Sequence, residues 1–412
     1  MSFLSHVECS VCGQRHDCKR LLTVCERCGQ MLVARYDLER VGARLTKDAL
    51  RSRPPGMHRF RELTPLDEGE EAVTLGEGGT PLLVMPRLAR HLGLTQVLAK
   101  DEGQNPTGTF KARGLGMAIT RARTLGARGF LIPSAGNAGG AAAVYAARAG
   151  LPCAVIVPRD TPAAAIAEAL IAGARVFTVE GTIATAGRIT ARVAPASRGW
   201  LDLSTLKEPY RLEGKKTMGL ELAEQLGWAE PDLLVYPTGG GTGLVGIAKA
   251  WEELTALGWL TGPRARFVCV QAEGCAPVVQ AWRDGAETTA AWPNPITSAP
   301  GLRVPSPFAG RQMLGVLRAS GGEAIAVGDD AIHEAQRLLA RLEGLWTAPE
   351  AAATVAALIE MTTRHAVSAD TRVVLVLTGS GLKNPPPPLP PPLHLTGTEE
   401  GIAAQVQAAL AR

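Results

Sequence analysis

One lysine, Lys111, stands between a turn-forming run and a segment that can form a helix. Asn105, Pro106 and Gly108 favour a tight turn, and residues 115–125 are compatible with a helix. A lysine held in such a place is poorly solvated, which lowers the pKa of its amine, and the neutral amine is the form that makes a Schiff base. The alternative is a surface lysine that happens to follow a loop, and the other motifs of the chain decide between the two.

Three further loops follow predicted strands and consist mainly of small residues; they span 133–140, 237–243 and 377–383. In open α/β sheets this edge is where ligands bind. In the first loop, the Asn137 amide can bond a ring hydroxyl, and the following helix offers free N–H groups to a carboxylate. In the third loop, the Thr378 hydroxyl can meet a buried heteroatom without adding charge.

The loop 237–243 favours a phosphate, because its consecutive glycines can form a nest of N–H groups in front of a helix. It is not a Walker loop, since no Gly-Lys-Ser/Thr ends it, and it has no acidic ribose partner of the kind that dinucleotide loops use. Together the loops describe a cofactor with a phosphate, a ring hydroxyl and a heterocyclic nitrogen beside an imine-forming lysine. Pyridoxal 5′-phosphate (PLP) carries all of these groups.

The elements that must position these loops alternate regularly. Short apolar runs bounded by Gly or Pro predict strands at 97–100, 130–133, 154–157, 176–179, 233–236, 267–271, 324–327 and 373–377. Ala-rich stretches predict helices at 138–149, 162–172, 217–226, 244–257, 329–341 and 349–365. This alternation indicates an α/β protein with parallel sheets, and its length indicates two such domains with the ligand between them.

The first 36 residues predict a separate small unit. Two Cys-x2-Cys knuckles, each followed by glycine, suit tetrahedral zinc in a ribbon; their cysteines are Cys9, Cys12, Cys25 and Cys28. The alternative is two disulfides or unrelated thiols, which a reducing compartment disfavours. Three nearby residues are expected to take no part, namely Cys18, His6 and His16.

Composition excludes several classes of function. The 412 residues include 46% hydrophobic and 20% charged residues, and 43 basic against 39 acidic residues leave a net charge of +4. This balance favours neither nucleic acid nor a membrane surface as partner. No secretory signal and no apolar run long enough to span a membrane are visible, so we expect a cytoplasmic protein. The proline-rich run 385–393 predicts a stiff spacer, with an SH3-like partner as the lesser alternative, and Thr398 can cap a final helix that runs to residue 410.

The chain resembles the fold-type II PLP enzymes, and most closely the threonine synthase family. The resemblance runs over residues 74–383 and rests on six motifs in order, at 76–81, 105–111, 134–137, 208–217, 238–243 and 378–383. It implies two parallel-sheet αβα domains with PLP between them, preceded by the ribbon. It divides the chain into a ribbon (1–40), a large domain (41–105 and 206–384), a small domain (106–205) and a tail (385–412).

The resemblance also implies roles for individual residues. Lys111 would form the Schiff base and shuttle protons, Asn137 would bind the ring hydroxyl, and Thr378 would meet the ring nitrogen. The cofactor phosphate would lie on Gly239, Gly240, Gly241, Thr242 and Gly243, and the substrate carboxylate on Ser134, Ala135, Gly136 and Asn137. Arg211, assisted by Lys215 or Lys216, would receive the leaving phosphate of O-phosphohomoserine. The alternative for Arg211 is a salt bridge between domains.

The sequence departs from the family at positions near the substrate. Ala112 stands where the family has Asp, Ala138 replaces a Thr, and Leu206 and Lys207 replace polar residues. A threonine/serine dehydratase, or another enzyme of β- or γ-elimination or replacement, is therefore the second interpretation. A non-catalytic scaffold that uses the ribbon and the tail is the third. We expect the protein to be a homodimer, and we expect its substrate to be a small amino acid.

Overall fold

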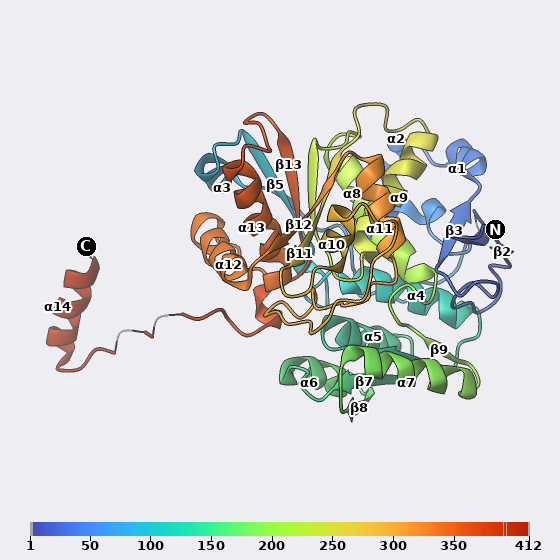
Figure 1. Cartoon of the computed structure of the whole chain (residues 1–412), viewed down its shortest axis with the longest axis horizontal. Helices are drawn as coiled ribbons and strands as arrows, with labels where there is room; N and C mark the ends of the chain where they lie inside the picture. The colour runs from blue at the N-terminus through green and yellow to red at the C-terminus, as the bar shows by residue number, and fades with distance from the viewer. Residues whose placement is uncertain (1–2, 390, 393, 411–412) are drawn as a thin grey trace.

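The computed structural model describes residues 3–389, 391–392 and 394–410, and residues 390 and 393 of the proline-rich run lie outside this description. Figure 1 shows two lobes, one above the other, with the N-terminal unit at one side and the C-terminal helix held away from the body. The upper lobe contains a six-stranded sheet and the lower lobe a four-stranded sheet.

The large sheet is parallel except for the edge strand β4, which pairs antiparallel with β5. Successive residues of its apolar strands are buried on opposite faces, as period-two alternation requires. The strands, in sheet order, are β12 (Glu323–Val327), β11 (Arg266–Ala272), β10 (Leu233–Pro237), β13 (Arg372–Leu377), β5 (Gln96–Asp101) and β4 (Leu82–Val84).

Helices cover both faces of this sheet. One face packs on α8 (Tyr210–Gln225), α9 (Thr242–Ala256), α10 (Pro277–Arg283) and α11 (Gly310–Ala319). The other face packs on α3 (Pro86–His91), α12 (Asp329–Glu343) and α13 (Pro349–Thr363). Two short helices, α1 (Leu38–Arg44) and α2 (Lys47–Arg51), and the 3-10 segments η1 (Met57–Leu63), η2 (Glu102–Gln104) and η3 (Gly381–Lys383) complete the upper lobe.

The small sheet is entirely parallel, with α5 and α7 packed against it. Its strands, in sheet order, are β8 (Arg175–Val179), β7 (Cys153–Pro158), β6 (Gly129–Pro133) and β9 (Trp200–Asp202). Its helices are α4 (Lys111–Thr124), α5 (Asn137–Arg148), α6 (Ala163–Ile171) and α7 (Ile183–Ala196). The small sheet comes from within residues 106–205 and the large sheet from either side of them, while the domain boundaries themselves stay a prediction.

All eight predicted strands and the alternating α/β order are confirmed. The prediction of a helix at 217–226 was wrong at its start, because α8 begins at Tyr210. The Glu208 carboxylate accepts the backbone N–H groups of Tyr210 at 2.7 Å and Arg211 at 3.0 Å, so it caps the helix at its N-terminus. Pro209 at the cap position therefore starts the helix and does not interrupt it.

The N-terminal unit is a three-stranded antiparallel sheet that packs on both α8 and α4. Its strands are β1 (Leu4–Cys9), β2 (Arg15–His16) and β3 (Leu32–Tyr36). The Cys18 carbonyl accepts hydrogen bonds from the Tyr210 hydroxyl and from Arg121. The Tyr36 hydroxyl donates to Glu213 at 2.7 Å, inside a buried cluster on α8 and α9. The unit is therefore tied to the same helix that carries Arg211.

The C-terminal helix α14 (Glu399–Leu410) projects from the body on an extended segment (Figure 1). Its predicted cap is confirmed, since Thr398 Oγ1 accepts the Gly401 N–H at 3.3 Å. None of its described residues is buried. The helix therefore contributes nothing to the core of this chain.

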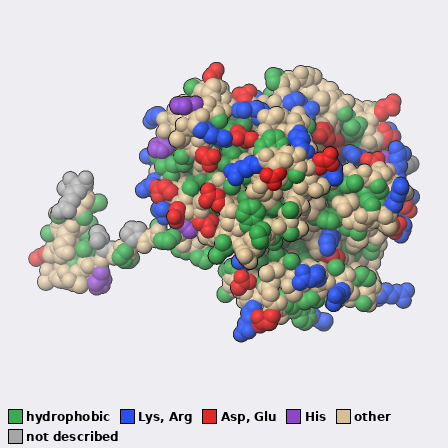
Figure 2. Space-filling view, viewed as in Figure 1, with side chains coloured by type: hydrophobic (Ala, Val, Ile, Leu, Met, Phe, Trp, Pro, Cys, Tyr) green, Lys and Arg blue, Asp and Glu red, His purple; other side chains and the backbone are tan. Residues whose placement is uncertain are grey.

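The face shown in Figure 2 carries Lys and Arg side chains interspersed with Asp and Glu, as the small net charge predicts. In the part of the chain that the structure describes, no helix is long and apolar enough to cross a membrane.

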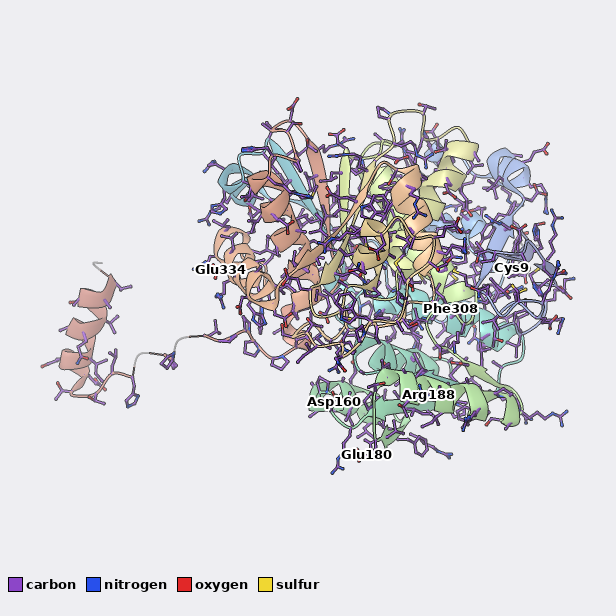
Figure 3. The ribbon with its side chains drawn as sticks, in the orientation of Figure 1. Cys9, Asp160, Glu180, Arg188, Phe308 and Glu334 are labelled. Atoms are coloured by element: carbon purple, nitrogen blue, oxygen red, sulfur yellow. The ribbon has the colours of Figure 1, made fainter. Side chains whose placement is uncertain are left out.

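Among the described residues, ion pairs join the lobes at several places. Lys383 Nζ of the upper lobe lies 2.7 Å from Glu168 Oε2 on α6, and Arg303 Nη2 lies 3.3 Å from Asp160 Oδ2. Figure 3 labels Asp160 on the lower lobe. The first of these pairs lies between the loop before α4 and the first turn of α5, since a Cβ at Gly108 would lie 3.0 Å from Lys383 Cδ and one at Gly140 would overlap the Glu168 carboxylate.

Candidate active site

Lys111 is the first residue of α4, directly after the predicted turn. Burial and the nearby charge of Arg211, partly offset by Glu350, together lower the pKa of its amine to about 8. Within the described residues its amine forms no ion pair, and Nζ lies 4.5 Å from the centroid of the Phe110 ring. The side chain thus has the poorly solvated setting that its position between turn and helix predicts.

The loop of Thr378 lies against the loop of Lys111. The Phe110 N–H donates to the Thr378 carbonyl at 2.9 Å, and the Ser380 N–H donates to the Gly108 carbonyl at 2.9 Å. Between these two hydrogen bonds, Thr109 and Gly379 pair as an isolated antiparallel β-bridge. Two loops about 270 residues apart in the sequence are therefore held as one unit by backbone hydrogen bonds.

Four buried charges, which sequence reasoning missed, hold the Lys111 loop in place. Arg113 donates to Glu102 through Nε at 2.7 Å and Nη2 at 2.8 Å, and to Glu221 through both Nη atoms at 2.7 Å. Lys100 Nζ completes the group at 2.8 Å from Glu221. Glu102 also accepts from Asn105 Nδ2 at 2.9 Å, so one carboxylate anchors both ends of the loop.

The four charges compensate one another, with two carboxylates against two cations. Burial alone would raise the pKa of Glu221, but Arg113 and Lys100 hold it well below its ordinary value. Burial would likewise raise the pKa of Glu102, but the charge of Arg113 keeps that pKa below its ordinary value. A network of this kind is stable only when every member is paired. In the sequence, the one indication of this buried network is Arg113, a charged residue two positions after Lys111.

The predicted glycine loop forms a cradle that tolerates no side chains. Gly241 has φ +78° and precedes α9, and a Cβ there would overlap the sulfur of Met313. A Cβ at Gly239 would overlap the Gly301 carbonyl, and one at Gly243 would overlap the hydroxyl of Tyr236. Only glycine therefore lets the backbone lie this close to its neighbours.

The residues present fit the phosphate of PLP. The Tyr236 hydroxyl beside Gly243 is buried and has no hydrogen-bond partner within the described residues. Burial raises the pKa of Tyr236 well above its ordinary value, so the hydroxyl remains a donor. A phosphate at the N-terminus of α9 would meet this donor together with the free N–H groups of the cradle.

The residues predicted for the ring also lie at strand ends. Asn137 opens α5 directly after β6, and Thr378 follows β13. Each is thus at the carboxyl end of a parallel strand, where ligands of open α/β sheets bind. Neither side chain forms a hydrogen bond to another described residue, which leaves both free for a ligand.

In the loop predicted to bind the substrate carboxylate, the Ser134 hydroxyl forms its hydrogen bonds to the backbone of its own segment. Ser134 Oγ accepts the Gly139 N–H at 2.8 Å and donates to the Gly136 carbonyl at 3.0 Å. The N–H groups of Asn137 and Ala138, by contrast, have no acceptor in the described part of the chain. Backbone N–H groups, rather than the serine hydroxyl, are therefore what this loop can offer an anion.

Arg211 lies in the first turn of α8 and is 1% exposed. Its Nη1 donates to the Leu203 carbonyl at 2.5 Å, and its buried Nε has no partner among the described residues. Among the described residues, no carboxylate forms an ion pair with its guanidinium, so the structure does not show the alternative of an interdomain salt bridge. Burial raises the pKa of the Glu208 carboxyl, and with the charge of Arg211 opposing the rise this pKa is about 7.

The side chains of the four predicted cysteines, Cys9, Cys12, Cys25 and Cys28, form one cluster. Their sulfur atoms all lie within 4.8 Å of one another, and all eight cysteines of the chain are free thiols. The N–H groups of Val11 and Cys12 point at Cys9 Sγ, at 3.5 and 3.4 Å, and Gly13 and Gly29 both have φ +70°. Figure 3 labels Cys9 in the N-terminal unit. As predicted, the cluster includes none of Cys18, His6 and His16.

A groove of about 620 Å³ lies elsewhere, between the N-terminal unit, α7 and β9. It is lined by Trp200, Lys207 and Phe308 among others, and Figure 3 labels Phe308. None of the residues predicted for the cofactor lines it. The groove is therefore separate from the residues predicted to bind the cofactor.

The first prediction concerns the buried network. Arg113→Met should destabilise the protein by roughly 3–5 kcal/mol, because it leaves two buried carboxylates with one lysine. Arg159→Met is the matched control, since Arg159 pairs on the surface with Glu180, which Figure 3 labels, and should change stability by less than about 0.5 kcal/mol. Denaturant unfolding measures both. Equal losses in the two variants would contradict the anchoring role.

The second prediction concerns pH. In cofactor-free protein, Lys111 should react with an amine-directed reagent at half its maximal rate near pH 8, because its pKa is lowered to about 8. Only the neutral amine reacts, so the rate rises with pH through that value. Mass spectrometry measures the labelling of Lys111, and the exposed Lys19 is the reference in the same sample. Identical pH profiles for the two lysines would contradict the prediction.

Comparison with known proteins agrees with this geometry. The model of the family described as pyridoxal-phosphate dependent enzyme matches residues 73–379. The threonine synthase of Methanocaldococcus jannaschii is 35% identical over 378 residues, and that of Methanosarcina acetivorans is 35% identical over 381 residues; each match covers 92% of both chains. Maize serine racemase shares the fold, with a TM-score of 0.63 at 22% identity over 81% of this chain and 92% of that chain. The chain belongs to the pyridoxal-phosphate dependent enzyme family.

Proposed function

We propose that the protein is a threonine synthase, which converts O-phospho-L-homoserine and water into L-threonine and phosphate. The observation that carries the proposal is the buried guanidinium of Arg211, which forms no ion pair among the described residues and whose charge acts on Lys111. The threonine synthases that match 92% of the chain support it. A dehydratase acting on serine or threonine would release no phosphate and would have no use for such a cation.

PLP, when bound, supplies an electron sink for the carbanion that forms next to the amino group of the substrate. Lys111 would hold it, its phosphate would lie on the cradle from Gly239 to Gly243, and Asn137 and Thr378 would contact its ring. A hydroxyl partner such as Thr378 leaves a ring nitrogen uncharged, which weakens the sink. More of the proton transfer then falls to a base of this chain.

Lys111 is suited to be that base. A general base works best when its pKa lies near the operating pH, and the pKa of Lys111 is lowered to about 8 by burial and by Arg211. Its Nζ can therefore take up a proton and return it near neutral pH. The buried network at Arg113 keeps the first turn of α4 in place while this occurs.

Two groups would orient the substrate. The free N–H groups of Asn137 and Ala138 at the start of α5 would bind its carboxylate. Arg211 would bind its phosphate, because a desolvated guanidinium forms strong charge-assisted hydrogen bonds to phosphoryl oxygens. The carbon atoms that react would then lie between these two anchors, next to Lys111.

We also propose that the four cysteines bind a structural zinc ion. Four thiolates with N–H···S bonds at the knuckles are a tetrahedral zinc donor set. Free thiols throughout the chain fit a cytoplasmic protein, which is where we place it. The Tyr36 and Cys18 contacts to α8 give the ribbon a direct tie to the helix of Arg211.

Product analysis tests the main proposal. PLP-loaded protein mixed with O-phospho-L-homoserine should release phosphate and threonine in equal amounts, and Lys111→Ala should release neither, because that variant lacks the base. Phosphate together with 2-oxobutanoate would show elimination without the addition of water. Absence of phosphate release, with turnover of serine or threonine instead, would overturn the proposal in favour of a dehydratase.

Metal analysis tests the zinc proposal. The purified protein should contain one zinc ion per chain, and Cys25→Ser should lose it and unfold at a lower temperature, because so small a ribbon depends on its metal. Cys18→Ser is the matched control and should keep the metal, since Cys18 is outside the cluster. A metal content that does not differ between the two variants would contradict the site.

A further inference from the structure

The groove beside the N-terminal unit is formed by three parts of the chain that are distant in the sequence. Its volume of about 620 Å³ is within the range of small-molecule sites, roughly 300–1,000 Å³. Leu21 and Val24 come from the N-terminal unit, Trp200 and Leu201 from β9, and Phe308 from the loop before α11 (Figure 3). These side chains give the groove an apolar wall.

The groove also carries two cations that form no ion pair with a described residue. Arg198 stands between α7 and β9, and Lys207 stands in the loop after β9. Asp202 is the only carboxylate among the lining residues. It is bonded to Ser204, from whose N–H and hydroxyl it accepts hydrogen bonds at 2.8 and 2.5 Å. An apolar wall with two unpaired cations fits an anion that has an apolar body.

The loop between β9 and α8 joins this groove to the candidate active site. Lys207 of this loop lines the groove. Earlier in the same loop, the Leu203 carbonyl accepts a hydrogen bond from Arg211 Nη1. Thr205 lies against the glycine cradle, since a Cβ at Gly240 would be 2.9 Å from Thr205 Cγ2. One short segment thus contacts the groove, the arginine and the cradle.

The same loop is held in a strained conformation. Leu206 has φ +61°, a left-handed value that a leucine rarely adopts. Its side chain is buried in the core of the upper lobe, which keeps the backbone in place. Strain of this kind persists only where the surroundings over-determine it, and it is common at ligand clamps and switch regions. The contacts on either side of Leu206 therefore decide whether this conformation is kept.

We propose that the groove binds a small organic anion with an apolar body, and that this ligand holds the loop between β9 and α8 in place and so tightens the binding of PLP. The apolar body would pack on Trp200 and Phe308, and the anionic group would meet Lys207 and Arg198. None of the residues assigned to the cofactor or to the substrate lines the groove. The inference therefore goes beyond the proposed function and does not depend on it.

The coupling follows from the contacts of the loop. When the anion holds Lys207, Thr205 remains against the cradle and the Leu203 carbonyl remains on Arg211. The phosphate site of the cofactor is then kept in the arrangement that the structure shows. Coupling between two ligands of one protein is reciprocal, so PLP tightens the binding of the anion by the same factor.

Titration calorimetry of the PLP-loaded protein with naphthalene-2-sulfonate tests the site, because this probe joins an apolar ring system to one negative charge. The wild type should bind it saturably, and Lys207→Gln should bind it at least about three-fold more weakly, through loss of one charge pair. Lys19→Gln is the matched control, since Lys19 is exposed in the N-terminal unit outside the groove, and it should bind like the wild type. The uncharged analogue naphthalene-2-methanol should bind equally to the wild type and to Lys207→Gln. Absence of saturable binding, or equal sulfonate affinity in these two proteins, would overturn the proposal.

A second titration measures the coupling to the cofactor. The full-length wild type should bind the sulfonate at least about five-fold more tightly with PLP than without it. Thr205→Ala should still bind the sulfonate, because Thr205 does not line the groove, but its affinity should no longer depend on PLP. Equal affinities of the wild type with and without PLP would contradict the coupling, and an undiminished PLP dependence in Thr205→Ala would exclude the loop as its route. Both titrations measure binding alone, so their outcome is independent of whether threonine is formed.

Discussion

The structure depends on one buried ionic network, in which Arg113 bonds Glu102 and Glu221 and Lys100 bonds Glu221. It joins the large sheet, through β5, to α4 and α8 at the point where the two lobes meet. Charges this deeply buried are stabilising only as a complete set, since each one left alone costs several kcal/mol. The network therefore allows only one position for the first turn of α4, and Lys111 is the first residue of that turn.

Helix α8 connects this network with Arg211 and with the contact between Glu213 and the N-terminal unit. Its last turns carry Glu221 of the network, its first turns carry Arg211 and Lys215 toward the cleft, and its opposite side carries Glu213 toward Tyr36 of the N-terminal unit. The helix is buried over most of its length, so it cannot shift at one end without moving the other contacts. The anchoring of the Lys111 loop, the position of Arg211 and the docking of the N-terminal unit are thus coupled through a single buried helix.

Much of the fold followed from the sequence, because strands buried on both faces are continuous apolar runs and ligand loops at their ends need glycine. The cysteine knuckles followed from their spacing alone. The start of α8 did not, since Pro209 is typical of a helix end as well as of a helix start. Helix α7 was missed although its apolar residues recur with helical spacing, because Gly187 and Pro195 inside it are typical of helix breaks.

The buried charges were beyond sequence reasoning for a different reason. Arg113, Glu221 and Lys100 are residue types that are almost always exposed, and their partners are distant in the sequence. The same holds for Lys215 and Lys216, which are neighbours in sequence and have different contacts in the structure. Period and composition predict which elements form, whereas the pairing of buried charges depends on how those elements pack.

The most direct test of the central claim is to identify the lysine that holds the cofactor. The PLP-loaded protein is reduced with borohydride, which fixes the imine permanently, and its peptides are mapped by mass spectrometry. We expect a pyridoxyl group on Lys111 and on no other lysine. A pyridoxyl group on Lys215 would contradict this expectation, because the network at Arg113 would then anchor a residue that does not hold the cofactor.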